Sequence, residues 1–120
     1  MNKKTLVIGA SIRPKRYSYR AVQKLKNYGH TVIPLGICEG EIDGIRIEHN
    51  YPELTGIDTV TMYLNPTKQS MYYDYIIRLR PDRIIFNPGT ENQEFKDLCK
   101  QNGIEVVEYC TLLLLSEELF

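Results

Sequence analysis

The chain has 120 residues and a mass of 14.0 kDa, and 42% of its residues are hydrophobic and 25% charged. These values are ordinary for a globular protein, and the length predicts one domain over residues 1–120 with a core that needs neither disulfides nor metal. Fifteen Lys and Arg balance fifteen Asp and Glu. A net charge of zero excludes an overall electrostatic preference for nucleic acid or for a membrane surface.

The three cysteines, Cys38, Cys99 and Cys110, are odd in number and have no regular spacing. This pattern does not predict a disulfide framework, and without a CxxC pair and with two histidines it does not predict a zinc site. The apolar run before Gly9 is too short for a signal peptide, and residues 112–115 are too few to span a bilayer. We therefore expect a reduced, cytoplasmic protein without a metal.

Apolar runs alternate with amphipathic stretches along the whole chain. The apolar runs predict strands at residues 5–8, 31–35, 58–64, 82–86 and 104–108. Hydrophobic residues three and four positions apart predict helices at residues 18–28, 67–79 and 92–102. Strands that alternate with helices are typical of βαβ units. The predicted fold is therefore α/β, a Rossmann-like three-layer sandwich with a mainly parallel five-stranded sheet.

Several details of this scheme are also predictions. Ser18 and Thr67 are expected to cap the first two helices, since their hydroxyls suit a helix N-terminus. Residues 36–44 are expected to form a loop, residues 45–48 at most a short strand, and residues 51–54 a single helical turn. The leucine-rich tail from residue 110 to residue 120 is expected to pack over an exposed sheet edge.

The first predicted strand runs into a glycine and a basic loop. After Gly9 come three cations within four residues and two nearby hydroxyls, namely Arg13, Lys15, Arg16, Ser11 and Ser18. A strand, a glycine turn and a helix N-terminus form the common anion-binding arrangement of α/β folds. The sequence thus predicts a site for a ligand with several phosphates. A solvated basic loop with Ser18 as an ordinary cap is the alternative, and the local composition does not decide between them.

This loop does not match a dinucleotide fingerprint. A GxGxxG motif would need glycine at positions 9, 11 and 14, where the chain has Gly9, Ser11 and Pro14. The acidic residue that usually follows the second strand and binds the NAD ribose is also missing, since Leu35-Gly36 stands there. NAD is therefore disfavoured, although the basic loop would suit the 2′-phosphate of NADP.

Open parallel sheets bind ligands outside the carboxyl ends of their strands, and this rule selects four more segments, at residues 36–40, 65–70, 87–92 and 109–111. Two of them begin with an Asn-Pro pair, at residues 65–66 and 87–88. In the segment at residues 87–92, Gly89 would let the backbone approach a ligand and Glu91 would accept a hydrogen bond from it. The same residues equally suit a plain strand–helix connection with a type II turn.

No pattern in the chain is typical of a catalytic group. His30 precedes the second strand, at the amino end of the predicted sheet, and His49 lies in a loop without an acid or nucleophile fixed beside it. Neither a Ser–His–Asp nor a Cys–His arrangement emerges. We therefore predict no catalytic residues.

A series of short motifs, spread along the chain in a fixed order, is shared with a known family. The motifs are Gly9-Ala10-Ser11, Arg13-Pro14, Tyr17-Ser18, Gly29-His30-Thr31-Val32-Ile33-Pro34, Ile42-Asp43-Gly44, Asp58-Thr59-Val60, Asn65-Pro66 and residues 85–92. With them the chain resembles the stand-alone CoA-binding proteins, which are related to the CoA-binding domain of succinyl-CoA synthetase α subunits. The resemblance covers essentially the whole chain.

This resemblance implies a Rossmann-like domain that binds coenzyme A or an acyl-CoA. Carried over by position, the cofactor-binding residues would be Gly9, Ser11, Arg13, Lys15, Ser18, Asn65, Pro66 and Gly89. The family often has Asn-Pro after its second strand, where this chain has Leu35-Gly36. The phosphohistidine and nucleotide-grasp domains of the synthetase have no counterpart in these residues, so the resemblance does not imply ligase activity.

The predicted function is a small cytoplasmic CoA-binding module without catalytic machinery of its own. Its predicted partner is a small-molecule CoA ligand, with neither nucleic acid nor membrane. The alternative is an NAD(P)- or nucleotide-binding enzyme or regulatory subunit of Rossmann type. The sequence leaves open whether the apolar tail mediates a homodimer or docking onto an acyl-CoA enzyme.

Overall fold

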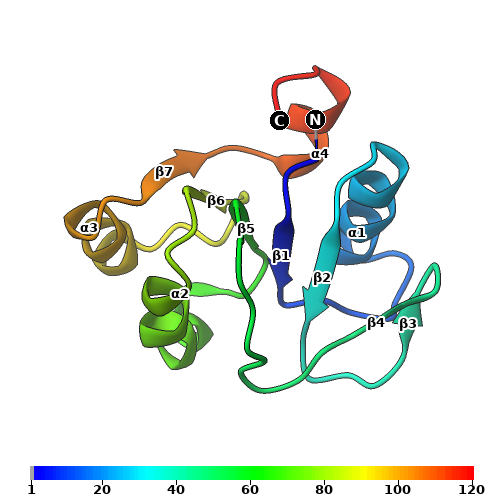
Figure 1. Ribbon diagram of the computed structural model, residues 1–120, viewed down its shortest axis with the longest axis horizontal. Coiled ribbons are helices and arrows are strands. Elements are labelled where there is room, and N and C mark those ends of the chain that lie inside the picture. Colours follow the sequence, from blue (N-terminus) through cyan, green and yellow to red (C-terminus); the bar gives the residue numbers. More distant parts are fainter. Residues whose placement is uncertain (1) are drawn as a thin grey trace.

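A computed structural model describes residues 2–120, and Met1 lies outside the described residues. Five parallel strands of this part of the chain form a sheet in the order β2-β1-β5-β6-β7, with helices on both faces (Figure 1). The strands are β1 (Thr5–Ile8), β2 (Val32–Leu35), β5 (Thr59–Met62), β6 (Arg83–Phe86) and β7 (Glu105–Glu108). The helices are α1 (Tyr17–Asn27), α2 (Tyr73–Leu79), α3 (Gln93–Gln101), α4 (Thr111–Ser116) and the 3-10 helix η1 (Pro66–Tyr72). The predicted fold class is confirmed.

The order of the strands creates a switch point between β1 and β5. The chain leaves β1 toward one edge of the sheet, through α1 to β2, and leaves β5 toward the other edge, through η1 and α2 to β6. Ile8 is level with both Leu35 and Met62, so three strands end together at this point. In open α/β sheets the loops that diverge at such a point leave a crevice for ligands.

The central strand is buried on both faces because each face carries its own helices. Leu6 and Ile8 pack with residues of α2 and α3, and Val7 packs with residues of α1 and α4. This explains why the first strand is apolar without alternation. In the first cluster, the ring of Phe95 packs edge-on against Phe86, with centroids 5.9 Å apart, and stacks on Tyr73 at 4.3 Å.

Both predicted helix caps are wrong. α1 begins one residue earlier than predicted, so Ser18 is buried within its first turn, and Arg16 occupies the capping position without a side-chain hydrogen bond. Before η1 the capping position belongs to Asn65, and Thr67 Oγ1 donates to its Oδ1 at 2.6 Å. Pro66 starts η1, because proline lacks an N–H and its φ is already helical.

The segment between β2 and β5 also differs from the prediction. The expected loop contains β3 (Glu41–Ile42), which pairs with β4 (Ile45–Arg46) in a short antiparallel hairpin. Asp43 and Gly44 form its turn with φ of 50° and 82°, which suits a tight hairpin. Residues 51–54 form no helical turn, and Tyr75 Oη donates to the carbonyl of Pro52 at 2.5 Å. This contact holds the segment extended along α2.

The leucine-rich tail covers a face of the sheet rather than its edge. Within α4, Leu115 is fully buried against Val7 and Val22. Beyond it, Phe120 reaches the amino edge of the sheet, where the guanidinium of Arg83 lies 4.4 Å from the centre of its ring. In Figure 1, α4 accordingly lies next to α1 and the start of β1. The tail and α1 together cover this side of β1.

No helix among residues 2–120 combines the length and the apolar character needed to cross a membrane.

Replacing Phe95 by alanine tests the aromatic centre of the core. The ring is fully buried between Phe86 and Tyr73, so we expect its removal to lower the free energy of unfolding by about 3–5 kcal/mol in urea titrations. Leu119 is 66% exposed, and its replacement by alanine should change that value by less than about 0.5 kcal/mol. Equal effects of the two substitutions would contradict the placement of the core.

Candidate functional site

Three loops meet backbone to backbone at the carboxyl edge of the sheet. The N–H groups of Gly9 and Ala10 both donate to the carbonyl of Leu35, at 2.9 and 3.0 Å. A Cβ on Gly9 would lie 3.1 Å from the backbone nitrogen of Leu64, and a Cβ on Gly36 would lie 2.3 Å from the carbonyl oxygen of Ala10. The loops after β1, β2 and β5 are therefore locked against one another, which fixes the position of the basic loop.

The basic loop forms a compact turn just beyond this contact. Ser11 Oγ accepts a hydrogen bond from the N–H of Arg13 at 3.1 Å, and the N–H of Arg16 donates to the Arg13 carbonyl at 3.0 Å. Three exposed cations follow one another here, namely Arg13, Lys15 and Arg16. Among residues 2–120 the salt bridge that forms joins Lys96 of α3 to Glu108 of β7. None of the three loop cations is therefore paired with a carboxylate in this part of the chain.

The helix that follows this turn has a free N-terminus. Its first backbone hydrogen bond runs from the N–H of Arg20 to the carbonyl of Arg16, at 3.2 Å. The N–H groups of residues 17–19 thus lack an acceptor within the helix, and the side chain of Arg16, at the capping position, does not accept from them; no other side chain among residues 2–120 does so either. Ser18 itself is buried in this first turn. Free N–H groups and the helix dipole together favour an anion.

The loops after β5 and β6 form the next part of the carboxyl edge. They are joined by Gln69, a fully buried residue of η1. Its Nε2 donates to the carbonyls of Leu64 at 3.0 Å and Thr90 at 2.7 Å, and its Oε1 accepts from Asn92 Nδ2 at 3.0 Å. Sequence reasoning missed Gln69, because its neighbours Lys68 and Ser70 are polar and give no sign that it is buried.

The segment that begins at residue 87 is built as a strand–helix connection. Gly89 has a φ of 90°, and its N–H donates to Glu91 Oε1 at 2.9 Å. Asn92 Oδ1 accepts from the N–H of Phe95 at 3.1 Å and so caps α3. Glu91 is therefore engaged within its own turn, whereas the position that a Cβ on Gly89 would take is open.

The structure distributes the predicted site residues over three adjoining loops. The first loop and the start of α1 carry Gly9, Ser11, Arg13, Lys15 and Ser18. Asn65 and Pro66 follow Leu64, which touches Gly9, and Gly89 lies one strand further along and is linked to them through Gln69.

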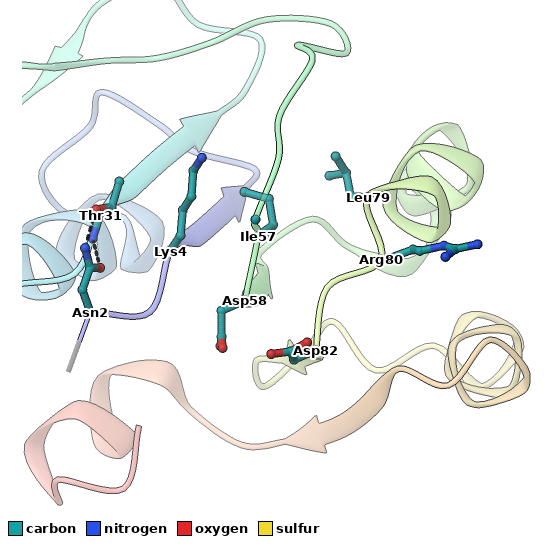
Figure 2. Close-up of a pocket in the computed structure, with 9 residues that line it drawn as sticks. Asn2, Lys4, Thr31, Ile57, Asp58, Leu79, Arg80 and Asp82 are labelled. Carbon is teal, nitrogen blue, oxygen red and sulfur yellow. Dashed lines mark hydrogen bonds between the residues drawn. The ribbon is translucent and has the colours of Figure 1, made fainter.

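A hollow of about 450 Å³ lies at the opposite, amino edge of the sheet (Figure 2). Its lining carries both signs of charge, from Lys4, Asp58, Arg80 and Asp82. Lys4 Nζ already donates to the carbonyl of Thr55 at 2.7 Å. Because parallel sheets bind ligands at their carboxyl ends, we place the candidate site at the first loop and not in this hollow.

The two histidines are both engaged in the framework. His30 Nδ1 accepts from the N–H of Lys3 at 2.9 Å at the amino edge, and burial lowers the pKa of its ring. His49 Nε2 lies 3.0 Å from the carbonyl of Cys38 and braces the loop after β2. No three His, Cys, Asp or Glu side chains within the described residues are grouped so as to hold a metal ion.

Comparison with known proteins agrees with the motifs and the fold. The family model described as a CoA binding domain matches residues 3–116. The chain belongs to this CoA binding domain family. The crystal structure of an uncharacterized protein is 48% identical, and the match covers 100% of this chain and 99% of that one with a TM-score of 0.97.

More distant solved structures share the fold of this CoA binding domain. Cell-free ID.343 from Thermus thermophilus is 23% identical, with 98% of this chain and 91% of that chain covered and a TM-score of 0.84. A hypothetical protein from Pyrococcus horikoshii OT3 is 22% identical, with 98% and 84% covered and a TM-score of 0.87. No curated protein matches the chain.

The thiols of this CoA binding domain differ sharply in environment. Cys38 and Cys110 are half-buried at the carboxyl edge, and Cys99 is fully buried in α3, where burial raises the pKa of its thiol to about 12. In titrations with an aromatic disulfide reagent near pH 8, we expect Cys38 and Cys110 to react in the folded protein and Cys99 only in denaturant, because it forms no thiolate. A Cys99→Ala variant should therefore show the same number of reactive thiols in the folded protein as the unchanged chain. Equal reaction rates of all three thiols would contradict this arrangement.

Proposed function

We propose that this domain is a cytoplasmic module that binds coenzyme A or an acyl-CoA, with the ligand's phosphates against the first loop and the start of α1. The observation that carries the proposal is a turn of three cations that have no carboxylate partner within residues 2–120; the turn directly precedes a helix without a side-chain cap, at the point where the strand order reverses. Membership in the CoA binding domain family supports the choice of ligand.

The charges of the ligand suit the charges of the loop. CoA carries a pyrophosphate and a separate 3′-phosphate. Three cations and a free helix N-terminus can bind a pyrophosphate and still leave positive charge for the 3′-phosphate. An NAD ribose would instead need an acid after β2, and Gly36 there is packed against Ala10 without room even for a Cβ.

In this proposal the residues have different roles. Gly9 permits the turn with its φ of 93°, and Ser11 holds the turn through the N–H of Arg13. Arg13 and Lys15 bind phosphate oxygens, and Ser18 contributes its N–H at the start of α1. Three further residues form the walls of the adjoining loops: Asn65, Pro66 and Gly89. The module itself carries no catalytic group in this proposal.

Isothermal titration tests the proposal directly. We expect heat of binding with CoA and acetyl-CoA, less with dephospho-CoA, which lacks the 3′-phosphate, and weaker binding still with NAD(H). Absence of CoA binding at about 1 mM ligand, or tighter binding of NAD(H) than of CoA, would refute the proposal.

Charge-removing variants test the role of the first loop. Arg13→Ala and Lys15→Ala should each weaken CoA binding, roughly threefold to tenfold at low salt, because each removes an exposed charge contact. The loss should shrink when salt is raised from about 0.05 to 0.5 M. Lys100→Ala, an exposed position on α3, is the matched control and should leave the affinity unchanged. Equal losses in all three variants would contradict the placement of the ligand.

A further inference from the structure

The charges of this chain are strongly segregated although their sum is zero. Residues 1–38 contain eight Lys and Arg and no Asp or Glu, and residues 39–120 contain seven Lys and Arg and fifteen Asp and Glu. The first part builds β1, the basic loop, α1 and β2, at one edge of the sheet. At the opposite edge of the sheet, β7 carries Glu105 and Glu108. A net charge of zero therefore hides a strongly basic surface.

The basic surface continues from the first loop along the outer side of α1. A stripe on this helix consists of Tyr17, Arg20, Lys24 and Tyr28, which are three, four and four residues apart and so lie on one face. The guanidinium of Arg20 lies 5.6 Å from the centre of the Tyr17 ring, and Lys24 Nζ lies 5.9 Å from that of Tyr28. The stripe is about 16 Å long.

The cations of this surface fall into two groups. Lys24 Nζ donates to the carbonyl of Leu112 at 3.1 Å, and Lys26 Nζ donates to that of Asp43 at 2.5 Å, so both hold neighbouring elements. Within the described chain, the other four make neither a salt bridge nor a side-chain hydrogen bond; they are Arg13, Lys15, Arg16 and Arg20. Four free cations within eight residues, without a carboxylate among them, are available to a polyanion.

An exposed aromatic ring lies in the middle of these free cations. Tyr17, at the first position of α1, is 65% exposed. A tyrosine this exposed contributes nothing to the core, so packing does not explain the ring. Surfaces for single-stranded nucleic acid combine cations along the phosphate backbone with aromatic rings on which bases stack. We propose that the first loop and the outer side of α1 bind a short segment of single-stranded nucleic acid.

The same surface suits an acidic protein less well. Protein interfaces usually have an apolar centre surrounded by polar residues of both signs. The stripe on α1 has no aliphatic side chain, and the hairpin places the acidic Asp43 beside Gln23 and Lys26 in the second half of the helix. A flexible single strand of nucleic acid can follow the first two turns of α1 and avoid Asp43. The net charge of zero was the reason to expect no nucleic acid, and the segregation of the charges removes that reason.

Fluorescence anisotropy of a labelled oligouridylate of about 15 nucleotides tests the proposal. The measurement is made without CoA, so its outcome is separate from that of the CoA titrations. With four phosphate contacts we expect the logarithm of the binding constant to fall with the logarithm of the salt concentration with a slope of about −3. The affinity should therefore drop roughly 50-fold between about 50 and 200 mM salt. Absence of binding at about 50 mM salt and 100 μM protein would overturn the proposal.

Variants separate specific binding from a general effect of charge. Arg20→Glu should weaken binding at least tenfold, whereas Lys100→Glu, which changes the charge equally on the exposed part of α3, should leave it unchanged. Tyr17→Ser should weaken it about fivefold by removing the stacking surface. Circular dichroism verifies that each variant is folded. Equal losses for the two Glu variants, or equally tight binding of a poly-glutamate peptide of the same charge, would overturn the proposal, and the peptide result would favour an acidic protein.

Discussion

The close contact of three backbones at the carboxyl edge of the sheet is the constraint on which the site depends. Gly9 lies against Leu64 and Gly36 against Ala10, in spaces that do not admit an ordinary Cβ contact. The carbonyl of Leu35 accepts from two successive N–H groups and joins the first loop to the second strand. Side chains between these backbones would separate the loops, and the basic turn would then lose its fixed place at the switch point between β1 and β5.

This constraint also explains a departure from the family pattern. The resemblance described from the sequence implies Asn-Pro after the second strand, and this chain has Leu35-Gly36. A proline, or any other residue with a Cβ, at position 36 would collide with the Ala10 carbonyl as the loops are placed here. The site therefore relies on backbone groups and on the cations of the first loop. Its second wall is held by hydrogen bonds from Gln69 to the neighbouring loops.

Much of the fold was predictable, because apolar runs without alternation identify central parallel strands and spaced apolar residues identify helices. The errors fell where local preference competes with a tertiary contact. Ser18 is a good cap by composition but is buried in the first turn of α1, and Thr67 pairs with Asn65 instead of capping a helix. Residues 51–54 form no helical turn, and the Pro52 carbonyl accepts a hydrogen bond from Tyr75 of α2. The buried role of Gln69 depends on partners far away along the chain, which no local pattern reports.

The sequence by itself determined the α/β class, the basic loop after the first strand and the likeness to the CoA binding domain family, because these depend on the order and spacing of residues. Only the tertiary structure decided which cations are free and which hold neighbouring elements. Lys24 and Lys26 bind carbonyls of α4 and the hairpin, whereas Arg13 and Arg20 have no such partner within the described residues. It also decided that the leucine-rich tail covers a face of the sheet. Hydrogen bonds and burial depend on which segments contact one another in space. The sequence did not reveal these features, because charge and periodicity along a chain do not specify such contacts.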